Sequence, residues 1–178
     1  MKRRKDLFQE NYAHNSKVDG DSTVTTKDRI VNDQNGTTGQ SFRYGNYPAS
    51  HNGCEAIAVH NSLVLLGKNS TLSDVMHKCQ QCGAMIGRGF LGSNPYGLGK
   101  VLSSYGVAWE KVKLSQLHRK GVYILSYWNR GMPFHGLHTV AVSYDGTVYT
   151  TYNLGSKPTQ IQPSAYAKRF ICGYYLES

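Results

Sequence analysis

The sequence lacks any long apolar run. Its 178 residues are 39% hydrophobic, yet no stretch approaches the roughly 20 apolar residues that a membrane span requires. The opening residues, MKRRKDLFQENYAHNS, have a basic start with no apolar stretch behind it, so we expect no secretory signal. These absences predict a chain without a membrane span and favour a cytoplasmic location.

Acidic residues are scarce. The chain has 11 Asp and Glu against 20 Lys and Arg, a formal net charge of +9, of which residues 44–178 carry +7 and residues 1–43 carry +2. The cations are scattered as single or paired residues, which is typical of a solvated surface. Because no predicted helix carries a basic stripe, we expect no specific nucleic-acid partner.

Only four cysteines are present, at Cys54, Cys79, Cys82 and Cys172. Without an export signal, free thiols are expected in preference to disulfides. Cys79-Gln80-Gln81-Cys82 has the spacing of a zinc or redox pair, but a structural zinc needs two more ligands and no second close pair exists. We therefore predict no metal and no other cofactor, and interpret this pair as partly buried thiols near a helix end.

The chain divides into two regions. Residues 1–43 are polar, poor in aromatic residues and rich in turn formers, which predicts an arm that is flexible or laid over the rest of the protein. Residues 44–178 have the composition of one compact domain. We see no internal repeat.

Helical patterns come first within this domain. Residues 55–66, EAIAVHNSLVLL, are apolar on nearly every face, which is typical of a central buried helix, and Gly67 provides its end. A second helix is predicted from a cap near Thr71 to about Cys82, and a third near Pro95. After Gly106 the runs become short, β-branched and aromatic. This order predicts an α+β fold with helices on one side of an antiparallel sheet.

A hairpin is predicted at Asp145-Gly146, which separates two alternating runs. If the turn has two residues, the residue numbers of two paired positions sum to 291, and Asn153 therefore lies across from His138. Antiparallel neighbours of this kind bring their Cβ atoms to ~5 Å.

Cys54 stands at the junction between a turn-forming Asn52-Gly53 pair and the predicted buried helix. Unpaired N–H groups and the helix dipole favour an anion there, so we expect the pKa of the thiol to be lowered toward the nucleophilic thiolate. The same N–H groups can hold an oxyanion after attack on a carbonyl. The alternative is a small buried apolar residue, the commonest state of cysteine.

A nucleophilic cysteine needs a base, and His138 is the favoured candidate because it opens the strand TVAVSYDG. His135 is a rival in a loop, while His60 lies on the helix of Cys54 but points to another side. Asn153 is the candidate for orienting the imidazole, whereas Asp145 is better explained by the turn.

Cysteine, histidine and asparagine in this order resemble the papain-like cysteine peptidase superfamily. NGCEAIAVHN, GFLGSNPYGLGKVL, HTVAV and YTTYN look most similar to its bacterial branch related to bacteriocin-leader peptidases, over about residues 44–176. The resemblance implies a papain-like fold and hydrolysis of a peptide or protein substrate. It also implies that Cys54 is the nucleophile, His138 the base and Asn153 the orienting residue.

The sequence departs from this family at two positions. The family has a glutamine about six residues before the cysteine, where this chain has Pro48. Asn46 and Asn52 are the nearby amides and therefore the candidate oxyanion donors. Glu55 stands where relatives often have glycine. These departures leave open a papain-fold acyltransferase or a catalytically inactive basic binding module.

The run Gly87-Arg88-Gly89-Phe90-Leu91-Gly92 satisfies a GxGxxG pattern. It does not follow a strand in a βαβ unit, so a dinucleotide site is not expected. We interpret it as a loop bordering a cleft, and in the papain-like reading as part of a substrate groove.

Overall fold

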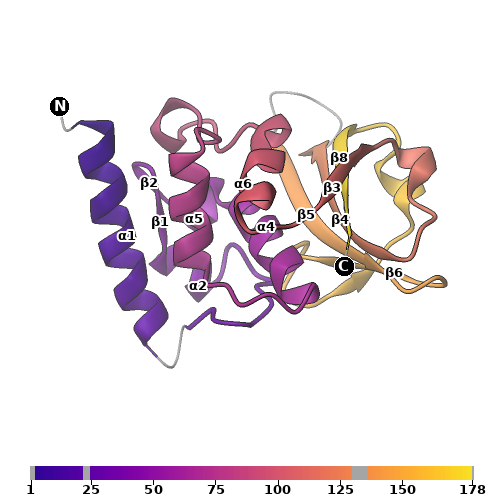
Figure 1. Cartoon of the computed structure of the whole chain (residues 1–178), viewed down its shortest axis with the longest axis horizontal. Helices are drawn as coiled ribbons and strands as arrows, with labels where there is room; N and C mark the ends of the chain where they lie inside the picture. Colours follow the sequence, from indigo (N-terminus) through magenta and orange to yellow (C-terminus); the bar gives the residue numbers. More distant parts are fainter. Residues whose placement is uncertain (1–2, 22–24, 130–135, 178) are drawn as a thin grey trace.

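The computed structural model describes residues 3–21, 25–129 and 136–177. Helices gather at one end of the molecule and a six-stranded antiparallel sheet forms the other (Figure 1). The predicted α+β class is confirmed. None of the helices in the described ranges is both long and apolar enough to cross a membrane.

The central helix is α4, Cys54–Leu65, and all of its residues from Cys54 to Leu63 are buried. It is followed by α5, Leu72–Gln81, and α6, Leu98–Ser104. Thr71 caps α5 by accepting a hydrogen bond from the Asp74 N–H at 3.2 Å, as its sequence pattern predicts. Three-residue 3₁₀ turns lie at Gly87–Gly89, Pro95–Gly97 and Leu114–Gln116, and a longer one at Pro163–Tyr166.

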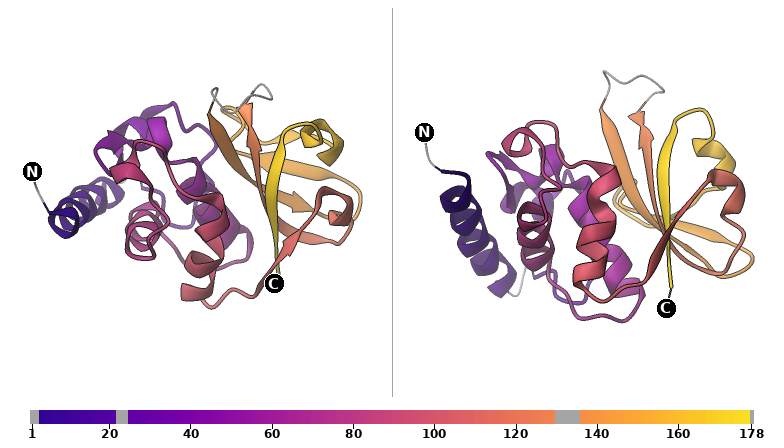
Figure 2. Two further views of the ribbon diagram at one scale, coloured as in Figure 1. Left: turned by 90° about the horizontal axis from the view of Figure 1, so that it is seen from above. Right: turned by 45° about the horizontal axis from the view of Figure 1, so that its top comes forward.

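The large sheet has the strand order β3-β8-β4-β5-β6-β7. Its strands are β3 Trp109–Val112, β4 Gly121–Trp128, β5 Leu137–Tyr144, β6 Tyr149–Tyr152, β7 Thr159–Gln160 and β8 Phe170–Leu176. Figure 2 shows the helices on one side of this sheet, with α4 against it. Along β4, Val122 and Ile124 belong to the core shared with the helices, while Tyr123 and Leu125 belong to a second core on the other face.

The β5–β6 hairpin differs from the sequence prediction. Tyr144 pairs with Tyr149 and Ala141 with Tyr152, so paired positions sum to 293, and the predicted two-residue turn is wrong. The connection has four residues because the Asp145 carboxylate accepts from the N–H groups of Thr147 and Val148, both at 2.8 Å. This Asx-type turn opens the loop and shifts the register by two residues.

The N-terminal region contains a helix that the sequence analysis did not predict. Helix α1, Arg4–Gly20, lies beside α5. Its apolar periodicity is weak because its inner side combines the buried Phe8 with two amide side chains. Asn11 donates to the Gly45 carbonyl at 2.8 Å, and Asn15 exchanges hydrogen bonds with the main chain of Arg43 at 2.8 and 2.9 Å. These contacts anchor α1 on the short strand β1, Arg43–Tyr44, which pairs with β2, Tyr47–Pro48.

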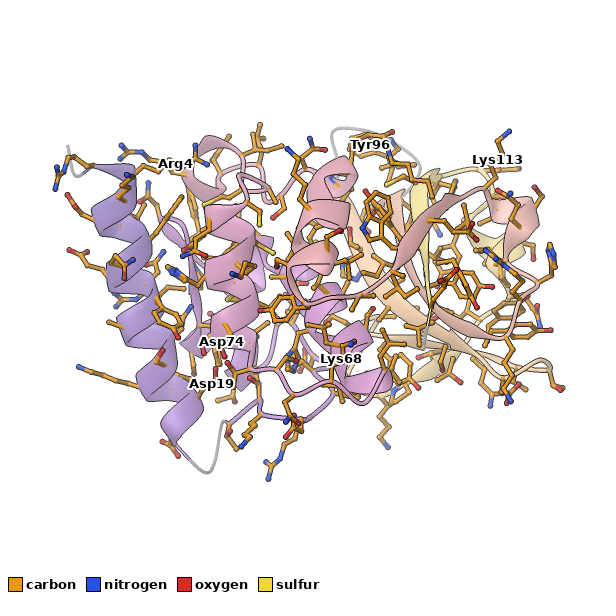
Figure 3. The ribbon with its side chains drawn as sticks, viewed as in Figure 1. Arg4, Asp19, Lys68, Asp74, Tyr96 and Lys113 are labelled. Carbon is orange, nitrogen blue, oxygen red and sulfur yellow. The ribbon has the colours of Figure 1, made fainter. Side chains whose placement is uncertain are left out.

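Both ends of α1 are attached to the helical part. Arg4 donates to the Met85 carbonyl at 3.1 Å, and Asp19 accepts from the Ser73 N–H at the start of α5 at 3.0 Å. Figure 3 shows Arg4 at one end of α1, and Asp19 near the other end, close to Asp74 of α5. The helix is therefore fastened along α5 by polar contacts.

The segment after α1 lies across the domain. Val31 is buried, and its N–H and carbonyl both bond to the Asn61 side chain of α4 at 2.8 Å. The chain then passes through α2, Thr37–Ser41, into the core at Phe42. Between Val31 and α2, the segment contacts Asn153 just after the end of β6, where the candidate site lies.

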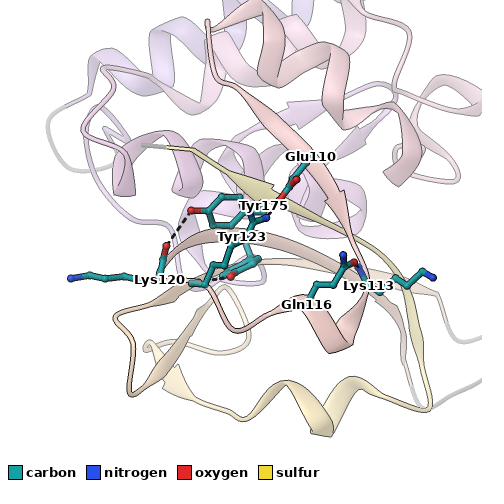
Figure 4. A network of polar contacts seen from close by, with 7 residues as sticks. Glu110, Lys113, Gln116, Lys120, Tyr123 and Tyr175 are labelled. Atoms are coloured by element: carbon teal, nitrogen blue, oxygen red, sulfur yellow. Dashed lines mark hydrogen bonds and ion pairs between the residues drawn. The ribbon is translucent and has the colours of Figure 1, made fainter.

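A polar network fastens the outer edge of the sheet (Figure 4). The Tyr175 hydroxyl donates to the Lys120 carbonyl at 3.2 Å, and the Lys113 N–H donates to the Gln116 side chain at 2.7 Å. Arg119 pairs with Glu110, and its guanidinium lies 4.0 Å from the centre of the Tyr175 ring. None of these residues lines a cavity next to Cys54, so we assign this network a structural role.

Candidate active site

Cys54 is placed by a tight turn between two helices. Helix α3, Ala49–Asn52, ends at Gly53, whose N–H donates to the Ala49 carbonyl at 2.7 Å, and α4 begins at Cys54. A Cβ atom on residue 53 would lie 2.7 Å from that same carbonyl oxygen, which is closer than side chains approach. The glycine before Cys54 is thus required for the turn that delivers the thiol to the start of the central helix.

The Cys54 side chain lies between two cavities. A polar cavity of about 230 Å³ is lined by Cys54, His51, His138, Asn153 and the segment 32–35. A more apolar cavity of about 460 Å³ is lined by Cys54 and Glu55 together with Ile86, Phe90, Leu91, Trp128 and Leu137. The loop that holds the GxGxxG pattern therefore borders a cleft, as the sequence predicted.

The ionisation of Cys54 differs from the sequence expectation. Its Sγ lies 3.3 Å from Glu55 Oε2 and 3.9 Å from the Leu137 carbonyl oxygen, and only 6% of the residue is exposed. Burial, followed by the neighbouring Glu55 carboxylate, raises the pKa of the thiol well above its ordinary value. The predicted lowering of this pKa by the helix start is wrong, because burial and a like charge outweigh the helix dipole.

Glu55 is a buried carboxyl group. It is 2% exposed, and within the described residues it takes part in no ion pair. Burial raises the pKa of Glu55 to about 7, although its own backbone, the Cys54 thiol and the Ser93 backbone act in the opposite direction. At neutral pH the Cys54 thiol therefore keeps its proton beside a carboxyl group that is itself near half-ionisation.

His138 is held by the main chain of Asn153. Its Nε2 lies 2.7 Å from the Asn153 carbonyl oxygen. Because a carbonyl only accepts hydrogen bonds, Nε2 carries the proton of the neutral ring and Nδ1 remains a free base. Burial lowers the pKa of His138, an effect that the Asn153 carbonyl partly offsets, so the ring is neutral at pH 7.

Asn153 follows β6 and has a left-handed backbone with φ of 65°, which asparagine tolerates better than most residues. Its side chain bonds to Gln34. Oδ1 accepts from the Gln34 N–H at 3.1 Å, and Nδ2 donates to Gln34 Oε1 at 3.3 Å. The structure thus brings Asn153 to His138, but the contact is made by its carbonyl, not by its amide side chain.

Cys54 and His138 line the same polar cavity and approach it from different elements, a helix and a strand. Within the described ranges, no hydrogen bond joins the thiol to the imidazole. The part of the chain that the structure describes therefore contains no preformed thiolate–imidazolium pair.

Of the two candidate oxyanion donors, Asn52 lines a cavity next to Cys54 and Asn46 does not. Asn52 lines the apolar cavity, but its Nδ2 donates to the carbonyls of Tyr44, at 3.0 Å, and Gly89, while its buried Oδ1 has no partner. Asn46 lines a separate cavity beside α1. The remaining donors near Cys54 are backbone N–H groups at the first turn of α4.

The other histidine and aspartate candidates are also placed. His60 is packed between the Arg29 carbonyl, at 2.9 Å, and the Ser70 hydroxyl, at 3.1 Å. Asp145 is exposed in the hairpin turn, and His135 lies outside the described residues. His51, which the sequence analysis did not propose, lines both cavities and stacks on Tyr47 with ring centres 4.8 Å apart.

The other cysteines are free thiols. Cys79 is fully buried, which raises its pKa to about 12, and Cys82 forms the end of α5. In residues 3–21, 25–129 and 136–177, no group of three or more His, Cys, Asp or Glu side chains is arranged to hold a metal ion. The Cys79–Cys82 pair thus lies at a helix end, as its sequence position indicated.

Sequence reasoning missed the contribution of residues 32–35 to the polar cavity. Their amide-rich sequence, Asn32-Asp33-Gln34-Asn35, is the one available signal, but the same composition is common in turns. No protein-family model matches this sequence, and a comparison with curated proteins finds no match.

We predict that Glu55→Gln increases the reactivity of Cys54. The substitution removes the carboxylate that, after burial, raises the thiol pKa. A like charge at this distance shifts a pKa by at least about one unit, so iodoacetamide should modify Cys54 on the order of 10-fold faster above pH 7. Because Glu55 is protonated below its pKa of about 7, the two proteins should converge at pH 5.

Peptide mapping by mass spectrometry gives the rate at Cys54 itself. Half-buried Cys82 in the same digests serves as the internal control, because it should react equally in both proteins. An unchanged Cys54 rate at pH 8 would contradict an electrostatic role for Glu55.

Proposed function

We propose that the chain is a cysteine peptidase with a papain-like arrangement of its site. The observation that carries this proposal is the His138–Asn153 contact of 2.7 Å, which leaves Nδ1 unprotonated in a ring that shares a cavity with Cys54. A thiol at the start of a buried central helix and a neutral imidazole on the adjacent sheet supply a nucleophile and a base.

In this mechanism Cys54 Sγ attacks the carbonyl carbon of the scissile peptide bond while its proton passes to His138 Nδ1. The carbonyl oxygen becomes an oxyanion, which backbone N–H groups at the start of α4 stabilise. The carbon–nitrogen bond then breaks, and His138 gives its proton to the leaving amine. Water attacks the remaining thioester with His138 again as base, which releases the acid and restores the thiol.

The two cavities give the substrate a path past the thiol. The apolar cavity on the Phe90 and Leu91 side suits a side chain of the substrate, since Phe90 is 62% and Leu91 66% exposed at its rim. The polar cavity on the His138 side suits the departing amine segment. A peptide or protein substrate crossing Cys54 would contact both.

A papain-like fold is part of the same proposal. Its support is the central helix that begins with the candidate nucleophile, the antiparallel sheet against it, and, in chain order, a histidine on β5 and an asparagine directly after β6. The oxyanion site departs from the family pattern, because this chain has Pro48 at the glutamine position and the side-chain donors of Asn52 are occupied.

The proposal is tested by incubating the protein with a mixture of unstructured peptides and identifying new termini by mass spectrometry. We expect cleavage that stops when Cys54 is alkylated. Added hydroxylamine should intercept a thioester and yield hydroxamates. If added amines are consumed in preference to water, the chain is an acyltransferase, and absence of both products under all conditions would reject a thiol-dependent reaction.

A non-catalytic binding module is the second candidate. It is favoured by one observation, the hydrogen bond that the Cys54 thiol makes with Glu55 and not with a base. A binding module should never form a thioester when it is exposed to an activated peptide ester. After alkylation of Cys54 it should keep its affinity for peptides only if the thiol lies at the margin of the peptide-binding surface. Intact-mass analysis of the protein after exposure to such an ester separates the two candidates.

A further inference from the structure

Gln34 holds the turn that carries the nucleophile. Its Nε2 donates to the main-chain oxygens of Ala49 and Ser50, both at 3.1 Å. These two residues begin α3, which leads through Gly53 directly into Cys54. One side-chain amide therefore fastens the segment immediately before the thiol.

The same residue also holds the support of the candidate base. The Gln34 N–H donates to Asn153 Oδ1 at 3.1 Å, and Asn153 Nδ2 donates back to Gln34 Oε1 at 3.3 Å. Asn153 is 3% exposed, and its N–H lies 3.4 Å from Asn32 Oδ1. Since the Asn153 carbonyl binds His138 at 2.7 Å, a continuous chain of hydrogen bonds connects the imidazole to the turn before Cys54.

Such a connection matters because the two reacting groups lie on separate elements. Cys54 belongs to a helix and His138 to a strand, and no hydrogen bond between them is present in the described residues. Both N–H donors and the oxygen of the Gln34 amide are used, so its position is fixed from both sides. The Gln34 side chain therefore joins the segment before Cys54 to the residue that binds His138.

We propose that Gln34 is a positioning residue that keeps His138 and the Cys54 turn in register, an inference that rests on the proposed peptidase function. It acts through Asn153 and α3 and does not touch the reacting atoms. Residues 32–34 thereby become a part of the site supplied by the N-terminal region.

Gln34→Ala tests this inference through two readouts. The first is the nitrogen-15 NMR signature of the His138 ring, assigned by its loss in His138→Ala. The unaltered protein should show the Nε2–H tautomer, and Gln34→Ala should show a mixture of tautomers because Asn153 is no longer held. The second is peptide cleavage, which should fall on the order of 10- to 100-fold, mainly in kcat, since small misplacements of reacting groups have effects of this size.

Matched variants separate positioning from general damage. Gln40→Ala changes an exposed glutamine six residues away and should leave both readouts unchanged. Asn153→Gly keeps the left-handed backbone and the carbonyl but removes the bonds to Gln34, so its effect should not add to that of Gln34→Ala. Gln34→Glu, which places an oxygen against the Ala49 and Ser50 carbonyls, replaces Gln34→Ala if that variant does not fold.

An unchanged His138 tautomer in a folded Gln34 variant would overturn the inference, as would fully additive effects of Gln34→Ala and Asn153→Gly. The ring measurement does not depend on catalysis. If the unaltered chain cleaves no peptide, the proposed function fails, while the tautomer result still decides the role of Gln34.

Discussion

Replacing Cys54 with alanine is expected to reduce peptide cleavage by at least about 10³-fold, to the background rate, because it removes the atom that forms the thioester. The substitution deletes one buried sulfur at the start of α4 and leaves the Gly53 turn and the helix core in place. The protein should therefore keep its folded circular dichroism spectrum and a cooperative thermal transition. Cleavage is measured with whichever peptide the mixture experiment identifies.

Cys82→Ala is the matched control. Cys82 is a half-buried free thiol at the end of α5, and it lines neither of the two cavities beside Cys54. This variant should cleave at the unaltered rate. Full activity of Cys54→Ala, or loss of activity in Cys82→Ala alone, would place the nucleophile elsewhere.

Replacing His138 with alanine is expected to lower cleavage at pH 7 by about 10²- to 10⁴-fold, the usual contribution of a general base. The raised pKa of Cys54 gives this prediction its pH dependence. In the unaltered protein, the neutral His138 ring, whose pKa is lowered by burial, should accept the thiol proton and should support activity from mildly acidic pH upward. Without this base, attack must await ionisation of the thiol itself, so the remaining activity should appear only at alkaline pH.

Two other histidines provide the comparison. His118 is exposed and lines neither of the two cavities beside Cys54, so His118→Ala should retain the complete pH profile. His51 lines both cavities, and His51→Ala should change substrate affinity without moving the acidic limb of the profile. If His51→Ala and not His138→Ala shifts this limb, His51 is the base and the role of the Asn153 carbonyl must be reassigned.

Local patterns in the sequence identified most of the regular elements. The apolar run at residues 55–66 gave the central helix, Thr71 gave the start of α5, and the β-branched runs after Gly106 gave the main strands. These signals are local because helix caps and side-chain periodicity depend on neighbours a few residues away. The same signals failed for α1, whose buried side combines a single fully apolar residue, Phe8, with the amides of Asn11 and Asn15.

The sequence by itself determined the position of Cys54 at the start of a buried helix and of His138 near the start of a strand, because both depend on turn and periodicity signals. Only the tertiary structure decided how these residues are supported. The turn at Asp145 shifts the hairpin register, and Asn153 contacts His138 through its carbonyl. Burial, together with the neighbouring Glu55, raises the pKa of Cys54. Gln34 contacts Asn153 although 119 positions separate the two residues in the sequence. Such contacts and burial depend on long-range packing, which local sequence patterns do not encode.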